Sequence, residues 1–289
     1  MTNFVHLFAY FTHNGQHGMR LASSRDGLTW EDIPGTGYVI VPEEGLMRDP
    51  FLLRAIDKTY HLIWTTDWES KDIGYASSKD LVNWSPQRRI PVMAKHPSVR
   101  NCWAPEMVFD PKIKKYRIYW ASTVPALYPE DSSSSESGYN HRMWSVTTTD
   151  FENISEPEVF FDPGFNVIDI TLHQTPDGQI RLIGKDERLD PEKKDLFFCE
   201  AKSHGGPFSP PSDPFTDSWV EGPACLQIGE WTHVYYDVYR EKRYEAKRTK
   251  NFKRWEDISD RLSFPKGARH GSMLTLSKTE FDHLFPKEK

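Results

Sequence analysis

Five segments of the chain mix apolar and polar residues and are rich in aromatic and β-branched side chains. Gly, Pro, Asn and Asp separate each of them from its neighbours, as is typical of the turns between strands. This pattern predicts β-strands, and hence an all-β protein. The five segments are residues 4–12, 59–66, 115–123, 180–186 and 232–239.

A short motif recurs after these segments. It reads SRDGLTW, SKDLVNW, TTDFENI and TKNFKRW, and SHGGPFS is a degenerate further copy. Asp and Ser favour turns in any protein, but five copies in one frame favour a repeat. The copies begin at residues 24, 78, 148, 203 and 249, in steps of 54, 70, 55 and 46. A period near 50 residues indicates a propeller or another array.

The two ends of the chain suggest how such a ring closes. Residues 1–23 precede the first copy and are too few for a four-stranded blade, whereas one good strand, 270–277, follows the last copy. We therefore expect a shared blade, with the C-terminal strand innermost and the N-terminal strands outside it. No Pro/Gly/Ser linker divides the chain, so residues 1–289 are predicted to form a single five-bladed β-propeller. The run 131–138 is predicted to be a polar, mobile loop.

Composition agrees with this fold and narrows the partners. Hydrophobic residues make up 37% of the chain and aromatic residues 13%, which suits small packed β-sheets. Aromatic ring faces also stack on sugars, although most of these rings are expected in the core. The net charge of −6 argues against nucleic acid as a partner. Three cysteines without metal-ligand spacing argue against a disulfide framework and against zinc.

The N-terminal segment shows no basic stretch followed by a long apolar run, and no apolar run approaches 18 residues. We therefore expect no signal peptide and no membrane partner. The chain as written is expected to be cytoplasmic, or secreted or periplasmic if a leader has been removed. It is expected to be a monomer or a weak oligomer.

Carboxylates mark four segments that would open blades. The segments are 47–54, 101–109, 166–173 and 220–227, and each carries an acidic residue at or near its start: Asp49, Glu106, Asp169 and Glu221. The innermost strands of a propeller run beside its central channel, so residues near their starts gather at one mouth. Glycoside hydrolysis needs such a gathering, with one carboxylic acid to protonate the leaving oxygen and one carboxylate to activate water. Crowding by a second carboxylate helps the acid to hold its proton.

These segments resemble those of glycoside hydrolase family 43, the arabinofuranosidases and β-xylosidases, over nearly the whole chain. The resemblance implies a five-bladed propeller that inverts the anomeric centre. It implies that Asp49, in Arg-Asp-Pro-Phe, is the general base and that Glu221, in Glu-Gly-Pro, is the general acid. Asp169, in Val-Ile-Asp-Ile, would raise the pKa of the acid and orient it. Trp103 belongs to a Trp-Ala-Pro signature of the second blade.

The resemblance also implies residues that bind the substrate. Arg269 would contact the sugar, and His270 would point into the channel, where a structural Ca²⁺ or a water cluster could lie. No required cofactor is expected, and His270 is the only candidate metal ligand. Trp68 and Trp103 are read either as sugar-stacking rings or as core. Glu106 and Glu187 are placed among the substrate-binding residues, and both are competing candidates for the acid.

The expected function is an exo-acting, inverting glycosidase that releases terminal α-L-arabinofuranose or β-D-xylose from plant-type polysaccharide or oligosaccharide. One alternative is a β-D-galactofuranosidase or another propeller glycosidase. Retaining fructosidases share the Arg-Asp-Pro element, but their Asn-Asp-Pro and Glu-Cys elements do not occur in this chain. The other alternative is a propeller that binds carbohydrate or protein without catalysis, because fold does not fix function.

Overall fold

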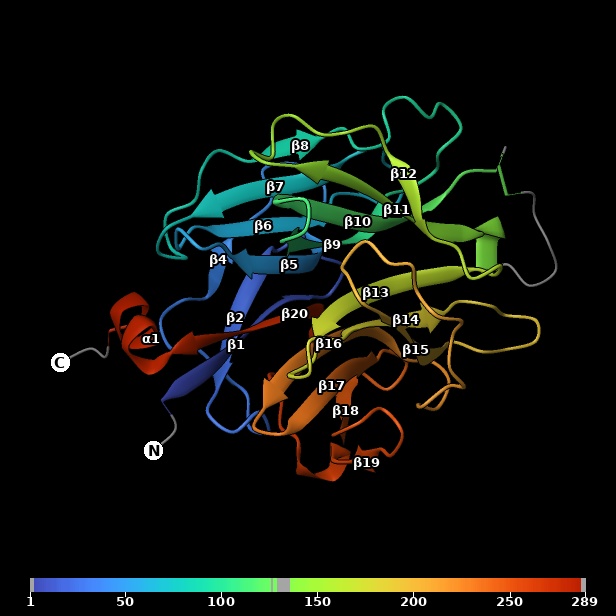
Figure 1. Cartoon of the computed structure of the whole chain (residues 1–289). Helices are drawn as coiled ribbons and strands as arrows, with labels where there is room; N and C mark the ends of the chain where they lie inside the picture. Colours follow the sequence, from blue (N-terminus) through green and yellow to red (C-terminus); the bar gives the residue numbers. More distant parts are fainter. Residues whose placement is uncertain (1–2, 126, 129–135, 287–289) are drawn as a thin grey trace.

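The structure, a computed structural model, describes residues 3–125, 127–128 and 136–286. These residues form five antiparallel sheets arranged around a common centre (Figure 1). Blade 1 consists of β5 (Arg48–Arg54), β6 (Tyr60–Thr65), β7 (Ile73–Ser78) and β8 (Arg88–Ile90). Blade 2 consists of β9 (Trp103–Asp110), β10 (Lys115–Thr123), β11 (His141–Thr148) and β12 (Glu158–Phe161).

The remaining three blades complete the ring. Blade 3 consists of β13 (Val167–Gln174), β14 (Ile180–Asp186) and β15 (Asp195–Ala201). Blade 4 consists of β16 (Glu221–Ile228), β17 (Trp231–Val238), β18 (Arg243–Thr249) and β19 (Glu256–Asp257). Blade 5 consists of β20 (Ala268–Ser277), β1 (Phe4–Thr12), β2 (Met19–Ser24), β3 (Glu31–Asp32) and β4 (Tyr38–Ile40). The predicted five-bladed propeller is therefore confirmed.

Both ends of the chain meet in blade 5, as the sequence predicted. The C-terminal strand β20 is innermost and pairs with β1, so the N-terminal strands lie outside it (Figure 1). The innermost strands β5, β9, β13, β16 and β20 each contact the next one around the ring. One short helix that the sequence pattern did not predict, α1 (Lys278–Leu284), follows β20. Its Glu280 bonds Arg54 and Tyr60 of blade 1 and so ties the two neighbouring blades together.

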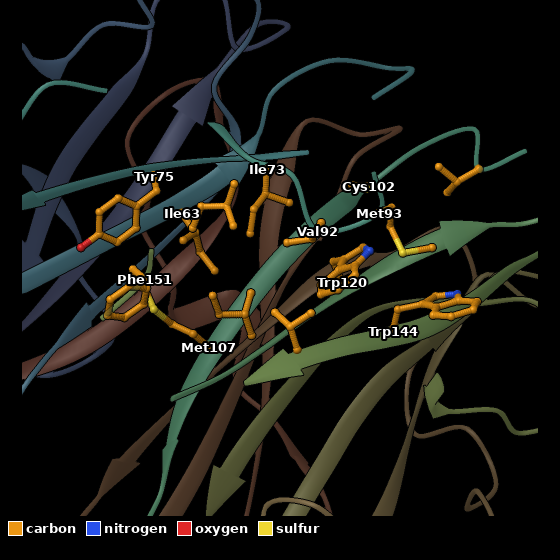
Figure 2. Packing of buried hydrophobic residues seen from close by; sticks show 14 of the residues in the cluster. Ile63, Ile73, Tyr75, Val92, Met93, Cys102, Met107, Trp120, Trp144 and Phe151 are labelled. Atoms are coloured by element: carbon orange, nitrogen blue, oxygen red, sulfur yellow. The ribbon is translucent and has the colours of Figure 1, made fainter. Parts of the chain in front are cut away.

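The core lies between blades rather than within one centre. Five clusters of buried side chains each join two adjacent blades. Because successive side chains of a strand point to opposite faces, neighbours on one second strand serve different clusters. On β6, Leu62 packs toward blade 5 and Ile63 toward blade 2. Figure 2 shows the cluster between blades 1 and 2, where Ile63 faces Trp120 and Met107.

The recurring sequence motif forms one type of turn at the end of the third strand of four blades. The hydroxyl of its first residue accepts a hydrogen bond from the backbone N–H three residues later, at 2.8–2.9 Å in all four copies. That later residue has a positive φ in every copy, between 57° and 71°. The residues that accept and donate are Ser24 and Gly27, Ser78 and Leu81, Thr148 and Phe151, and Thr249 and Phe252.

Blade 3 departs from the repeat at the degenerate copy. The segment 203–209 follows the third strand β15 at the expected place, but it lacks the Asp or Asn of the other copies. Its turn is closed instead by a backbone bond from Gly206 N–H to the Ser203 carbonyl oxygen. No fourth strand follows among the described residues of this blade, which has three. Across the described part of the chain, no helix is long and apolar enough to cross a membrane.

Candidate active site

Every innermost strand has a β-bulge at the same step, where two of its residues face a single residue of the second strand. The pairs are 49–50 opposite 64, 104–105 opposite 120, 169–170 opposite 184, 222–223 opposite 236, and 270–271 opposite 10. Bulges bend the strand and re-aim its side chains, and they are common beside active sites. The five bulges therefore put equivalent residues of all five blades around one mouth of the channel.

The first bulge residue has a left-handed backbone in four blades. Its φ is 50° at Asp49, 46° at Ala104, 50° at Asp169 and 58° at Gly222. Few residues other than glycine adopt this conformation, and Asp tolerates it better than most. Asp49 and Asp169 thus occupy equivalent positions on blades 1 and 3, while Glu221 lies one residue before the bulge of blade 4.

A pocket of about 490 Å³ opens at this mouth. Eight of the nine residues that the sequence suggested for the site line it: Asp49, Trp68, Trp103, Asp169, Glu187, Glu221, Arg269 and His270. The three predicted catalytic acids therefore meet in one cavity, although they come from three different blades. Bulges and strand order bring them together across 172 positions of sequence, from residue 49 to residue 221.

Asp49 is held from two sides. Its Oδ2 accepts a hydrogen bond from the Thr65 hydroxyl at 2.8 Å, and Thr65 Oγ1 itself accepts from the Ala104 N–H at 2.8 Å. Its Oδ1 lies 3.4 Å from Nδ1 of His270. These contacts fix the carboxylate in orientation, as a base that must act on one water molecule requires.

Asp169 is the more enclosed of the two aspartates. Its Oδ2 accepts a hydrogen bond from the Gly222 N–H at 3.1 Å and lies 3.7 Å from Nδ1 of His270. Burial raises the pKa of Asp169 to about 6, against the attraction of His270 and Lys185. Asp169 therefore changes its charge within the range where many enzymes work, and it does so beside the backbone that carries Glu221.

Glu221 lies between two cationic side chains. Its Oε1 is 3.0 Å from Nη2 of Arg269, and its Oε2 is 3.5 Å from Nζ of Lys185. Burial acts to raise the pKa of Glu221, but Lys185 and Arg269 outweigh it and hold that pKa below its usual range. Lys185 and Arg269 therefore favour an ionised Glu221, which must gain a proton before it can act as an acid.

The arrangement suits acid–base chemistry on a bond held in the pocket, and comparison with known proteins agrees. The profile of a family-43-related group, described as a probable glycosyl hydrolase domain, matches residues 3–282. The chain belongs to glycoside hydrolase family 43. The resemblance inferred from the motifs is therefore confirmed.

One curated relative of this family 43 chain is an α-L-arabinofuranosidase of Bifidobacterium longum subsp. longum. The two are 23% identical over 156 residues, which are 46% of this chain and 14% of that protein. The chain thus matches only a small part of the relative's length.

Solved structures share the fold at low identity. A thermostable family-43 glycoside hydrolase is 15% identical, with 80% of each chain covered and a TM-score of 0.60. An α-L-arabinofuranosidase from Lactobacillus brevis is 15% identical, with 74% of this chain and 72% of that one covered and a TM-score of 0.52. An exo-β-1,3-galactanase from Clostridium thermocellum is 14% identical, with 77% and 49% covered and a TM-score of 0.56.

Glu106, the ninth suggested residue, does not line the pocket of this family 43 hydrolase. Its side chain is buried behind the pocket, and its Oε2 accepts a hydrogen bond from the Tyr119 hydroxyl at 3.0 Å. Burial raises the pKa of Glu106 to about 8. This placement makes Glu106 a neutral hydrogen-bonding group of the wall at neutral pH, and it gives no direct path to a substrate.

The residues missed from the sequence include three polar side chains that contact the acids or Arg269: Thr65, Lys185 and Asp237. They occupy one step of the second strands, paired in register with the residue that precedes the bulge in blades 1, 3 and 4. Asp237 Oδ2 lies 3.1 Å from Nε of Arg269 and thereby fixes the guanidinium that contacts Glu221. A polar residue inside an otherwise apolar strand is costly to bury without partners, and this was the available signal.

Aromatic rings form two walls of the pocket. Trp68 and Trp103 meet edge to face, with ring centres 5.7 Å apart, and Trp103 Nε1 donates to the Trp68 carbonyl oxygen at 2.9 Å. Trp68 remains 46% exposed, so part of its surface is open to a ligand. Trp219 and Tyr239 line the pocket from blade 4, beside Glu221. Both predicted tryptophans are thus at the pocket rather than in the core.

Metal binding at His270 stays a prediction. The imidazole contacts Asp49 and Asp169 through Nδ1. Within residues 3–125, 127–128 and 136–286, no group of three or more His, Cys, Asp or Glu residues is arranged to hold a metal ion. The two contacts of Nδ1 make His270 a link between the two aspartates.

Proposed function

We propose that this family 43 hydrolase is an inverting, exo-acting glycosidase that releases terminal α-L-arabinofuranose, with β-D-xylose as the second candidate sugar. The observation that carries the proposal is the meeting of Asp49, Asp169 and Glu221 in one pocket with Arg269 and His270. Asp49 and Glu221 come from blades 1 and 4, so a sugar between them meets a carboxylate on each side.

The roles follow from the contacts. Asp49, oriented by Thr65 and His270, draws a proton from the attacking water. Glu221 gives its proton to the leaving oxygen on the opposite side of the sugar. Asp169 bonds the backbone N–H of Gly222, next to Glu221, and its negative charge opposes ionisation of the acid. Inversion requires this division of work, with water and leaving group on opposite faces.

The position of Glu221, the proposed proton donor, determines where the leaving group must lie. Because Glu221 belongs to blade 4, the departing sugar lies toward Trp219 and Tyr239, which line the pocket with their ring centres 6.4 Å apart. The terminal sugar then lies toward Trp68 and Trp103. Each half of the substrate thus has aromatic surface available for stacking.

Exo action requires a pocket rather than an open cleft. The Ser272 hydroxyl donates to the Pro50 carbonyl oxygen at 3.0 Å and accepts from the Leu52 N–H at 2.8 Å, which joins the innermost strands β20 and β5 beside the pocket residues Asp49 and His270. In the loop between β10 and β11, the described residues Ser137 and Tyr139 line the pocket. Residues 126 and 129–135 of that loop, which include much of the predicted mobile run, lie outside the described residues.

A panel of aryl glycosides tests the proposal. It contains α-L-arabinofuranoside, β-D-xylopyranoside and β-D-galactofuranoside, together with a β-1,3-linked galacto-oligosaccharide. We expect turnover of the arabinofuranoside, with the inverted anomer formed first in the NMR spectrum. Turnover of another sugar would replace the named substrate, a retained first anomer would contradict the mechanism, and turnover of none would contradict the proposal.

Two variants separate catalysis from binding alone. Asp49→Ala and Glu221→Ala are expected to abolish turnover while sugar binding, measured by calorimetry, is largely kept. A protein that binds the sugar equally well in all three forms, with no wild-type turnover, would be a binding module instead.

A further inference from the structure

A buried lysine of the pocket wall lies between two carboxylates. Lys185 is only 2% exposed, and its Nζ is 3.5 Å from Oε2 of Glu221 and 2.9 Å from Oε2 of Glu187. The other oxygen of Glu187 lies 2.5 Å from Nζ of Lys194. The four side chains form a row of alternating charge that runs from the proposed acid to a second lysine of the pocket lining.

A contribution to folding stability does not by itself explain why these four charged side chains are buried in a row. Removing two charges from water costs several kcal/mol per ion, and a buried pair often contributes no more than apolar residues of similar volume would. One carboxylate would be enough to compensate Lys185, yet its ammonium is shared, and the nearer partner is the one that is not proposed to be catalytic. The position of that ammonium decides how much positive charge Glu221 experiences.

Charged groups on the neighbouring strands also face Glu221, and they contribute to the electrostatic potential at its carboxylate together with Lys185. Arg269 and His270 come from β20, Arg48 from β5, Asp169 from β13, and Asp237 and Tyr239 from β17 and the turn after it. Arg269 is itself bound to Asp237, so part of its charge is already compensated. Lys185 is the other cation close to Glu221. Its ammonium is shared between Glu221 and Glu187, and Glu187 is not part of the proposed acid–base pair.

We propose that Lys185 is a positioning residue that controls when Glu221 becomes protonated, and that Glu187, held by Lys194, sets the strength of this control. The inference rests on the proposed role of Glu221 as the acid. When the ammonium lies close to Glu187, Glu221 is freer to take up a proton. When it lies close to Glu221, the acid stays ionised.

The row also connects the acid to the bound substrate. Glu187 and Lys194 both line the pocket on the side of the leaving group, together with Trp219. A sugar hydroxyl that takes the place of Lys194 at Glu187 leaves that carboxylate with Lys185 as its cationic partner, and the ammonium moves away from Glu221. Substrate binding thereby promotes protonation of the acid where the proton is needed.

Substitutions of Lys185 and of Glu187 are expected to shift the titration of Glu221 in opposite directions. Lys185→Met removes the cation, and we expect the titration of Glu221 and the alkaline limb of kcat/KM to move up by about one pH unit. Glu187→Gln removes the negative charge that competes with Glu221 for the Lys185 ammonium. We therefore expect the titration of Glu221 and the alkaline limb of kcat/KM to move to lower pH. The titration is followed by NMR of ¹³C-labelled glutamate carboxyls, with Glu221→Gln to assign the signal.

Matched controls separate this role from a structural one. Lys185→Arg keeps the charge and is expected to restore a titration close to that of the wild type. Lys250→Met removes a lysine from an exposed pair with Glu230, far from the pocket lining, and is expected to leave the profile unchanged. If Lys185→Met does not fold, Lys194→Met replaces it, because Glu187 then draws Lys185 more strongly and the titration of Glu221 again moves up.

Shifts in the same direction for Lys185→Met and Glu187→Gln, or no shift in either, would overturn the inference. The NMR titration needs no turnover, so it remains decisive even if the panel of glycosides shows no activity. Failure of the proposed function and failure of this inference are therefore separate results.

Discussion

Blades 1 and 3 place the same residue type at the same point of the same bulge, yet the two aspartates have different surroundings. Asp49 and Asp169 both have φ of 50° and both approach Nδ1 of His270. The second-strand residue at the equivalent step is Thr65 in blade 1 and Lys185 in blade 3. Thr65 donates directly to Asp49, whereas Lys185 is directed to Glu187 and Glu221.

The difference between the two blades shows which part of the fold determines where a carboxylate lies and which part determines its hydrogen bonds and pKa. The bulge determines where a carboxylate enters the pocket. The side chain at the equivalent step of the second strand determines whether that strand gives the carboxylate a hydrogen bond, as Thr65 gives Asp49, or a charge that is directed to other groups, as with Lys185. The same bulge, repeated around the ring, thus places a carboxylate oriented by a hydroxyl in blade 1 and a carboxyl with a raised pKa in blade 3.

The largest expected effect is at blade 1. Asp49→Asn removes the proposed general base while the side-chain oxygen can still accept from Thr65, so kcat is expected to fall by about 10²- to 10⁴-fold. Steady-state kinetics on the arabinofuranoside would measure it. A loss below tenfold would show that Asp49 is not the base.

The equivalent change at blade 3 is expected to cost less activity. Asp169→Asn removes a charge that acts on Glu221 but touches neither the water nor the leaving oxygen, so we expect kcat to fall by about 10²-fold. The loss should be smaller for aryl glycosides with good leaving groups, because they need less help from an acid. An equal loss for good and poor leaving groups would argue against a role through the acid.

The same substitution is expected to stabilise the protein at alkaline pH. The pKa of Asp169 is raised from 3.8 to about 6 by burial, so its contribution to stability is fully present below about pH 4 and is lost as the pH rises through 6. Above pH 7, Asp169→Asn should therefore be more stable than the wild type by about 2–3 kcal/mol. Urea unfolding at pH 4 and pH 8 measures the difference, and an equal gain at both would contradict this origin.

The smallest expected effect is at Thr65. Thr65→Val removes the hydroxyl that orients Asp49 and leaves the Ala104 N–H without its partner, at a cost of about 1–3 kcal/mol in unfolding free energy. We expect kcat to fall about tenfold with little change in KM. Thr65→Ser keeps the hydroxyl and is the matched control. If the serine variant loses as much as the valine variant, orientation of Asp49 by this hydroxyl is not important.

Much of the architecture was predictable because it depends on local sequence patterns. The strand 115–123 and the strand 180–186 were predicted with the bounds that the structure has. The turn motif identified the blades because each copy needs a hydroxyl and a left-handed residue three positions later. Blade 5 was predicted from simple counting of the strands left over at the two chain ends.

The contacts around the acids were less predictable, because they depend on which residues the bulges bring into register across strands. Lys185 looks like any other polar position in the strand 180–186 until β14 is aligned with β13. Glu106 looked equivalent to the acids because it also lies near the start of an innermost strand. It lies two residues beyond the first bulge residue, Ala104, and its side chain points behind the pocket rather than into it.

The closure of the ring by β20 has a consequence for the order in which the pocket is completed. Arg269 and His270, which contact Glu221 and both aspartates, lie on β20, which follows the strands of blades 1–4 in the chain. During synthesis, blades 1–4 can therefore form while the pocket still lacks these two side chains. The pocket gains them only when β20 has been made and has paired with β1, so a complete pocket reports that the whole ring has folded.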